Sequence, residues 1–172
     1  NNMSYIMRLF SFFRYCYLAI IQARKIEYDI VFGSSTPLTI SIPGILLSKL
    51  KKTPFILEIR DLWPELPIAI GALRSQFSIY LAKLLERWSY DNADHIIGLS
   101  EDMCQNIEMN GQAKNKISNI PNGCDIDLFN IENKKGEEFR NKYDWLGSNP
   151  LVIYTGALGK MNNVSFLVEI AN

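Results

Sequence analysis

Five short apolar runs alternate with longer segments of helical character along this chain, and this alternation restricts the fold more than any other feature. The runs are rich in β-branched and aromatic residues. Such runs are typical of strands buried in a parallel sheet, and their alternation with helices predicts an α/β fold in which helices cover both faces of the sheet. The sequence therefore predicts a Rossmann-like parallel sheet flanked by helices. The predicted strands are 28–33, 54–59, 93–99, 116–120 and 151–155.

The helical segments between these strands differ in clarity. The clearest is 74–92, where apolar residues recur every three or four positions and predict one apolar face. The segment 37–52 alternates like a strand and contains Pro43, but its length favours a kinked helix. Ser100, followed by two acidic residues, predicts a helix N-cap. The apolar face predicted for 74–92 consists of Phe77, Leu81, Leu84 and Trp88.

Composition restricts the class of protein. The chain has 172 residues and is 48% apolar, which is enough to bury a core and excludes a disordered chain. It carries 18 basic and 18 acidic side chains, and this balance gives no overall attraction for nucleic acid. Cys16, Cys104 and Cys124 are widely spaced without a Cys/His pairing, which argues against a disulfide framework and a zinc site. The pattern fits a reducing compartment, and we expect no bound metal.

Residues 5–21 form an apolar and aromatic segment that basic and polar residues interrupt. The interruptions leave it short of the roughly 20 apolar residues that a transmembrane helix needs. One interpretation is a helix that touches a membrane surface, with aromatic residues in the interface and basic residues near lipid phosphates. The other is a core helix buried against the sheet. The residues of the membrane interpretation are Phe10, Phe12, Phe13, Tyr15 and Tyr17, with Arg8, Arg14, Arg24 and Lys25.

Small, polar and charged residues follow every predicted strand. In an open parallel sheet, ligands bind at the carboxyl ends of the strands, where loops converge and helix N-termini point their amides. The pattern therefore predicts a ligand-binding edge. The segments that follow the strands are 34–37, 60–65, 100–102, 121–125 and 155–160.

The segment 60–65, RDLWPE, holds charged groups beside a large aromatic surface. Trp63 is suited to stacking on a sugar ring, and the carboxylates of Asp61 and Glu65 accept hydrogen bonds from hydroxyl groups. The alternative is a structural pair between Arg60 and a carboxylate, with Trp63 in the core.

The segment 156–160, GALGK, has glycines that allow a phosphate to approach the backbone between a strand and a helix. It lacks the spacing of a Walker A motif, and the dinucleotide fingerprint GxGxxG is absent. A generic pyrophosphate cradle and a plain tight turn remain as interpretations.

Four motifs, in order, carry a resemblance to a known family. RDLWPE (60–65), LERWSYDNADHIIGLS (85–100), IPNGCDIDLF (120–129) and YTGALGK (154–160) resemble the family 4 glycosyltransferases, particularly bacterial enzymes of O-antigen and capsule assembly. The resemblance implies the GT-B fold, in which two Rossmann-like domains face each other across a cleft, the first binding the acceptor and the second the nucleotide sugar. It also implies transfer with anomeric retention, without an obligatory metal or other cofactor beyond the nucleotide-sugar donor.

The resemblance assigns parts of the chain to that fold. Residues 1–124 correspond to the acceptor-side domain without its first strand, and 125–149 correspond to the interdomain crossing and the start of the second domain. Residues 150–172 correspond to the first strand, loop and helix of the nucleotide-sugar domain. By this resemblance the chain is a fragment, and we expect it to lack turnover by itself.

The resemblance also implies roles for single residues. Asp61 lies where many relatives place a polar residue over the reacting sugar, so it is the leading catalytic candidate. The donor-phosphate loop would use Gly156, Gly159 and Lys160, although two positions that are usually basic in the family are not basic here. The candidates for acceptor or sugar binding are Ser34, Ser35, Arg60, Trp63, Glu65 and Asn122.

The function implied is a glycosyltransferase of cell-surface polysaccharide synthesis, such as lipopolysaccharide or capsule, that moves a hexosyl or N-acetylhexosaminyl group. Its expected partners are a nucleotide-sugar donor and a polyprenyl-diphosphate-linked or saccharide acceptor, with peripheral membrane contact through 5–21 at the cytoplasmic face. One alternative is a sugar-nucleotide epimerase of GT-B architecture, which needs acid/base side chains that the chain does not display. The other is a non-catalytic α/β binding module.

Overall fold

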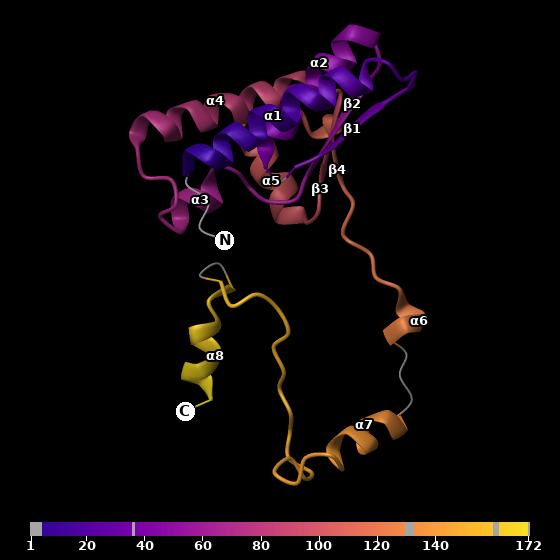
Figure 1. The fold of residues 1–172 in the computed structure, drawn as a ribbon, viewed down its shortest axis with the longest axis vertical. Coiled ribbons are helices and arrows are strands. Elements are labelled where there is room, and N and C mark those ends of the chain that lie inside the picture. Colours follow the sequence, from indigo (N-terminus) through magenta and orange to yellow (C-terminus); the bar gives the residue numbers. More distant parts are fainter. Residues whose placement is uncertain (1–4, 36, 130–132, 160–161, 172) are drawn as a thin grey trace. The chain divides into compact units, whose positions relative to one another are not determined.

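The structure is a computed structural model that describes residues 5–35, 37–129, 133–159 and 162–171. The chain divides into two compact units, which we call unit 1 (1–122) and unit 2 (123–172) (Figure 1).

Unit 1 contains a four-stranded parallel sheet in the order β1-β2-β3-β4. Four of the predicted strands are confirmed, and so is the Rossmann-like parallel sheet flanked by helices. The register pairs Val31 with Phe55 and Ile56 with His95, so the strands begin at nearly the same level. The strands are β1 (Val31–Ser34), β2 (Phe55–Ile59), β3 (His95–Gly98) and β4 (Ile117–Asn119).

Helices precede, connect and follow these strands. The ambiguous segment 37–52 forms a 3-10 turn followed by an α-helix, and Pro43 lies in the first turn of that helix, where its missing N–H is tolerated. The Ser100 hydroxyl accepts a hydrogen bond of 3.2 Å from the Met103 amide, which confirms the predicted N-cap. The helical elements are α1 (Tyr5–Ala23), η1 (Leu38–Ile40), α2 (Ser41–Lys51), α3 (Glu65–Ala69), α4 (Gln76–Asn92), α5 (Glu101–Met109) and η2 (Lys114–Lys116).

In the described part of unit 1, the helices that connect the strands pack on one face of the sheet, whereas the sequence pattern predicted helices on both. The buried side chains of β2, such as Leu57, share one core with Ile45 of α2, Tyr90 of α4 and Ile107 of α5. The reason is topological: the strand order never reverses, and right-handed crossovers then place every connecting helix on the same side. The other face is more open, and Phe32 on it is 56% exposed.

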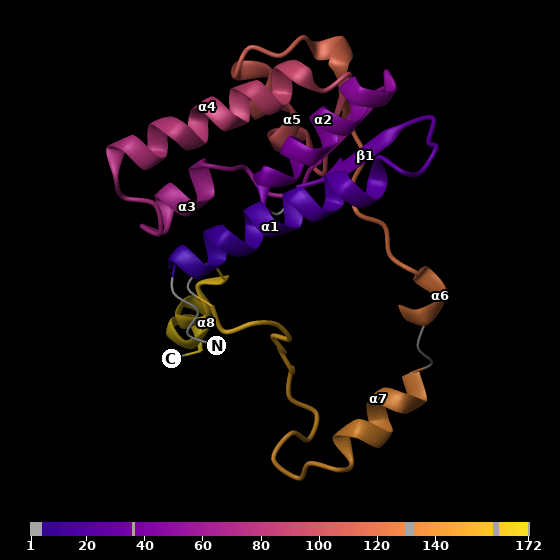
Figure 2. The same cartoon turned by 45° about the horizontal axis from the view of Figure 1, so that its top comes forward.

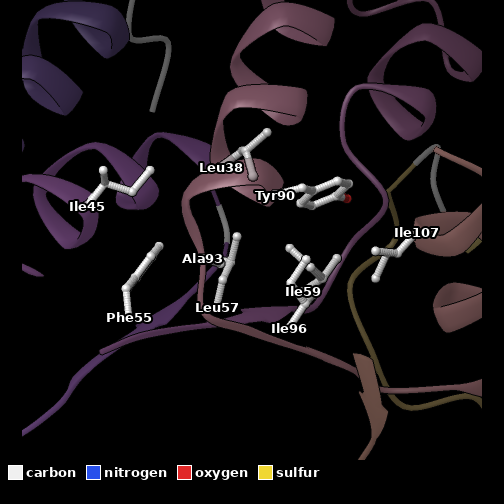
Figure 3. Close-up of a cluster of buried hydrophobic side chains, with 9 residues drawn as sticks. All are labelled: Leu38, Ile45, Phe55, Leu57, Ile59, Tyr90, Ala93, Ile96 and Ile107. Carbon is white, nitrogen blue, oxygen red and sulfur yellow. The ribbon is translucent and has the colours of Figure 1, made fainter. Parts of the chain in front are cut away.

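The core lies between this sheet face and the helices. Side chains from β2 and β3 point toward α2, α4 and α5, as Figure 3 shows. Burial of these apolar groups is the main stabilising contribution to unit 1. The buried cluster consists of Leu38, Ile45, Phe55, Leu57, Ile59, Tyr90, Ala93, Ile96 and Ile107.

Helix α4 forms as predicted, but it buries a different face. Phe77, Leu81 and Leu84 of the predicted apolar face are 70%, 47% and 53% exposed. Packing against the core decides the orientation of the helix, and it turns the smaller residues Ala82 and Ser89 inward. The buried residues of α4 are Ala82, Glu86, Ser89 and Tyr90.

Unit 2 contains short helices, and the predicted strand 151–155 does not form in it. A strand needs a partner for its backbone groups, and the described residues of unit 2 contain no strand that could supply one. Val152 in this segment is 89% exposed. The helices are α6 (Ile126–Phe129), α7 (Asn133–Arg140) and α8 (Val164–Ile170).

Candidate functional site

The carboxyl ends of β1 and β2 are joined by side-chain hydrogen bonds. Ser34 and Glu58 are register partners on the open face of the sheet, and the Ser34 hydroxyl donates to Oε2 of Glu58. Ser35 is 3% exposed, its amide donates to the Glu58 carbonyl at 2.8 Å, and its hydroxyl accepts from the Arg60 amide at 3.0 Å. Ser34, Ser35 and Arg60, which the sequence analysis singled out, therefore lie together. The Glu58 carboxylate thus has a serine hydroxyl as its hydrogen-bond partner.

Arg60 and Asp61 follow directly on β2 at this edge. Arg60 is exposed and Asp61 is partly exposed, so both side chains are accessible to a ligand. The Ser35 hydroxyl holds the backbone of this loop at Arg60, the residue before Asp61. A carboxylate that starts from this backbone position is suited to accepting hydrogen bonds from sugar hydroxyl groups.

Trp63 turns from this edge toward the core. It is partly buried and packs against the hydrophobic cluster, and the Trp63–Pro64 peptide bond is cis. This packing corresponds to the structural alternative considered for Trp63, although part of the indole remains exposed.

Glu65, at the start of α3, lies in a polar pocket that sequence reasoning did not identify. This pocket of about 190 Å³ lies beside α4, and the Glu65 Oε2, Glu86 Oε1 and Tyr90 hydroxyl oxygens are buried without a hydrogen-bond partner among the described residues. Burial, and then the charge of Glu65, raises the pKa of Glu86 to about 7. Burial likewise raises the pKa of Tyr90, and the Glu86 charge adds to this shift. The signal in the sequence was only the four-residue spacing of Glu86 and Tyr90, which also occurs on solvated helix faces.

A second pocket, of about 400 Å³, lies between α1 and the end of β1. Its lining is mainly apolar, and it extends from the flank of α1 to the Ser34 that bonds Glu58. The pocket therefore connects the N-terminal helix with the carboxyl edge of the sheet. The lining residues are Ser11, Phe12, Tyr15, Ser34, Pro37, Thr39 and Ile40.

Asn122 and the glycine loop complete the predicted set. Asn122 is exposed at the end of unit 1. In unit 2, a Cβ at Gly156 would lie 2.7 Å from the Tyr154 hydroxyl, so the loop is compact there, whereas Gly159 has open space around it. The Tyr154 hydroxyl donates to the Ala157 carbonyl at 3.1 Å. Lys160 lies outside the described residues.

Within the described residues, no cluster of three or more His, Cys, Asp or Glu side chains is arranged to hold a metal ion. Nor does any described helix combine the length and apolar character needed to cross a bilayer.

An open parallel sheet with hydroxyl, carboxylate and guanidinium groups at the carboxyl ends of neighbouring strands defines a Rossmann-like ligand-binding unit. The family model described as Glycosyltransferase Family 4 matches residues 3–128, and the chain belongs to this family.

Individual relatives agree with this assignment. The chain is 22% identical over 177 residues to the Escherichia coli K12 protein described as "Putative colanic acid biosynthesis glycosyl transferase WcaI". Crystal structures of HepE from Anabaena, one in complex with UDP-glucose and one with UDP and glucose, match 91% of the chain with a TM-score of 0.67 at 18% identity. The chain spans 43% of WcaI and 39% of HepE.

Proposed function

We propose that the full-length protein transfers a sugar from a nucleotide-sugar donor to a lipid-linked or saccharide acceptor during synthesis of a cell-surface polysaccharide. The family match over residues 3–128 carries the proposal. WcaI, by its description, belongs to colanic acid biosynthesis, and HepE binds UDP-glucose in its crystal structure. A UDP-linked hexose or N-acetylhexosamine is therefore the first donor to test. O-antigen and capsule are the polysaccharide classes proposed, and a lipid-linked acceptor places the enzyme at the inner face of the cell membrane.

The proposed reaction retains the anomeric configuration. The bond between the sugar C1 and the donor diphosphate breaks, and the acceptor oxygen forms its bond to C1 on the same face of the sugar. The acceptor hydroxyl proton passes to the leaving nucleoside diphosphate. Because negative charge develops on that leaving group, its stabilisation is the main catalytic demand.

Each unit supplies one part of this chemistry in the proposal. In unit 1, Asp61 orients sugar or acceptor hydroxyl groups, and the bonds between Ser34 and Glu58 and from the Arg60 amide to Ser35 hold the surrounding edge. A positioned carboxylate contributes by fixing the attacking hydroxyl group near C1. Trp63, Glu65 and Asn122 remain proposed sugar contacts.

In unit 2, the proposal assigns the donor diphosphate to the Gly156 and Gly159 amides and to Lys160. The space around Gly159 allows a phosphate to approach the backbone, and a lysine supplies the counter-charge. Neither role calls for a metal ion.

A donor screen on the full-length protein tests this function. UDP-hexoses and UDP-N-acetylhexosamines are incubated with polyprenyl-diphosphate-sugar acceptors, the product mass is measured, and NMR determines the new anomeric centre. We expect one donor to give a single addition with retained configuration. Interconversion of the donor without an acceptor would instead indicate the epimerase, and donor binding without any transfer would indicate the binding module.

A further inference from the structure

Helix α1 presents a row of exposed aromatic side chains. Phe10, Phe13 and Tyr17 are 69%, 63% and 63% exposed, and their spacing of three and four residues places them on one helix face. About a quarter turn around the helix from the centre of this row, Cys16 is 5% exposed, and its thiol donates to the Thr39 carbonyl at 3.5 Å. The helix is therefore held to unit 1 along the side of Cys16, and the aromatic row stays exposed, at the periphery of this unit (Figure 2). Adjacent large apolar side chains on a surface mark an interaction site.

The charge of α1 and of the turn after it, up to Ile26, has a single sign, and the first acidic residue, Glu27, pairs with Lys51 at 2.8 Å. The first 26 residues contain four basic residues and no acidic residue, a net charge of +4, whereas the whole chain has a net charge of zero. Arg14 lies on the exposed side, and Arg24 and Lys25 follow the end of the helix. Aromatic residues beside basic residues, with no acidic residue among them, are complementary to a lipid surface, which has an apolar interior beneath anionic headgroups.

We infer that α1 lies in the interface of an anionic lipid bilayer, with Phe10, Phe13 and Tyr17 among the headgroups and the basic residues against lipid phosphates. This inference rests on the proposed function, because a lipid-linked acceptor is presented at a bilayer. The flank of α1 that carries Phe12 and Tyr15 borders the pocket that reaches Ser34. This flank is on the far side of the helix from the aromatic row, so docking through the row would leave the pocket uncovered.

Charge favours a bilayer over a second copy of this chain. Pairing two α1 helices by their aromatic rows would bring Arg14 of each copy into a surface without acidic residues, and like charges repel. Lipid phosphates are complementary to that surface. Helix α4 also exposes an apolar row, but its exposed charges are mixed, because Asp91 lies 3.8 Å from Arg87.

Vesicle sedimentation of the full-length protein tests the inference. The vesicles consist of phosphatidylcholine alone or of phosphatidylcholine with phosphatidylglycerol. We expect binding to the anionic vesicles only, and roughly tenfold or greater weakening in the triple variant Phe10→Gln/Phe13→Gln/Tyr17→Gln. Arg14→Gln, Arg24→Gln and Lys25→Gln should each weaken binding roughly fivefold at low salt, with a smaller effect at high salt.

Helix α4 offers a matched control with the same spacing. Phe77→Gln/Tyr80→Gln/Leu84→Gln removes three exposed apolar side chains and should leave vesicle binding unchanged. Wild-type binding by the α1 variant, or an equal loss in the α4 control, would overturn the inference. The inference would also be overturned if the wild-type protein were oligomeric and bound no vesicles, and only the α1 variant were monomeric. That result would assign the aromatic row to a contact with a second copy.

Failure of the inference is distinguishable from failure of the proposed function. The α1 variant should keep wild-type transfer to a water-soluble acceptor, since none of its three residues lines the pocket or the sheet edge. Vesicle binding by a protein that transfers no sugar would contradict the proposed function and leave the inference standing. Sugar transfer by a protein that binds no vesicles would contradict the inference and leave the proposed function standing.

Discussion

Glu86 shows what burial does to a single residue. It is 5% exposed and lies with Glu65 and Tyr90 in the pocket beside α4. Burial raises the pKa of its carboxyl group to about 7. An unfolded glutamate ionises near its ordinary value of 4.5. Between these two values the folded state binds more protons than the unfolded state, so the group costs stability increasingly as the pH rises.

Glu86→Gln should therefore stabilise the chain at pH 8 and have little effect near pH 4.5. The gain at high pH is on the order of 3 kcal/mol, because a glutamine mimics the protonated side chain and does not ionise. Urea unfolding at both pH values, followed by tryptophan fluorescence, measures it. Glu108→Gln, at an exposed position on α5, is the control, and a gain independent of pH in Glu86→Gln would contradict the explanation.

Asp61→Ala in the full-length enzyme should lower kcat by roughly tenfold or more, because the carboxylate positions the reacting hydroxyl groups. Steady-state kinetics with the donor found in the screen measures this, and Asp61→Asn separates charge from hydrogen bonding. Asp29→Ala, an exposed residue before the other end of β1, should leave kcat unchanged. Near-wild-type turnover in Asp61→Ala would show that Asp61 does not take part in catalysis.

At the scale of elements, the contact between α2 and β2 depends on a residue without a side chain. A Cβ at Gly44 would lie 2.4 Å from Cε2 of Phe55, which is fully buried in the core. Gly44 therefore permits α2 to approach the sheet closely enough to cover Phe55. A glycine lowers the intrinsic helix propensity of α2, but here it is needed for the packing of that helix.

Gly44→Ala should destabilise unit 1 by about 1–3 kcal/mol, because the added methyl group overpacks the core. Gly136→Ala in α7 is the matched control: its Cβ has open space, so the higher helix propensity of alanine should leave stability unchanged or raised by up to about 1 kcal/mol. Denaturant midpoints compare the two. Partial rescue of Gly44→Ala by Phe55→Leu would assign the loss to this contact, and equal effects in both alanine variants would refute it.

At the scale of the whole chain, the two units differ in how much they bury. Unit 1 has a continuous core between four strands and their helices, whereas Leu146 is the only buried apolar side chain described in unit 2. Residues 152–159 are exposed throughout. Local stability follows burial and backbone hydrogen bonding, so it should be concentrated in unit 1.

Hydrogen exchange of this 172-residue chain should show that difference. Amides of β2 and β3 should exchange most slowly, because they open only when the core unfolds, and those of 151–155 should exchange fast. Mass spectrometry of peptides from both regions measures this. Protection at 151–155 would show instead that the strand predicted from the sequence does form in the chain.

Local patterns in the sequence determined the four strands of unit 1, their helices, the Ser100 cap and the gathering of Ser34, Ser35 and Arg60 at one edge. These follow because strand composition, capping and the carboxyl-end rule depend on neighbouring residues and on a parallel sheet. Tertiary structure alone decided which face of α4 is buried, that the connecting helices share one face, and that Glu65, Glu86 and Tyr90 meet. Those outcomes depend on contacts between residues far apart in the chain, and no local periodicity encodes them.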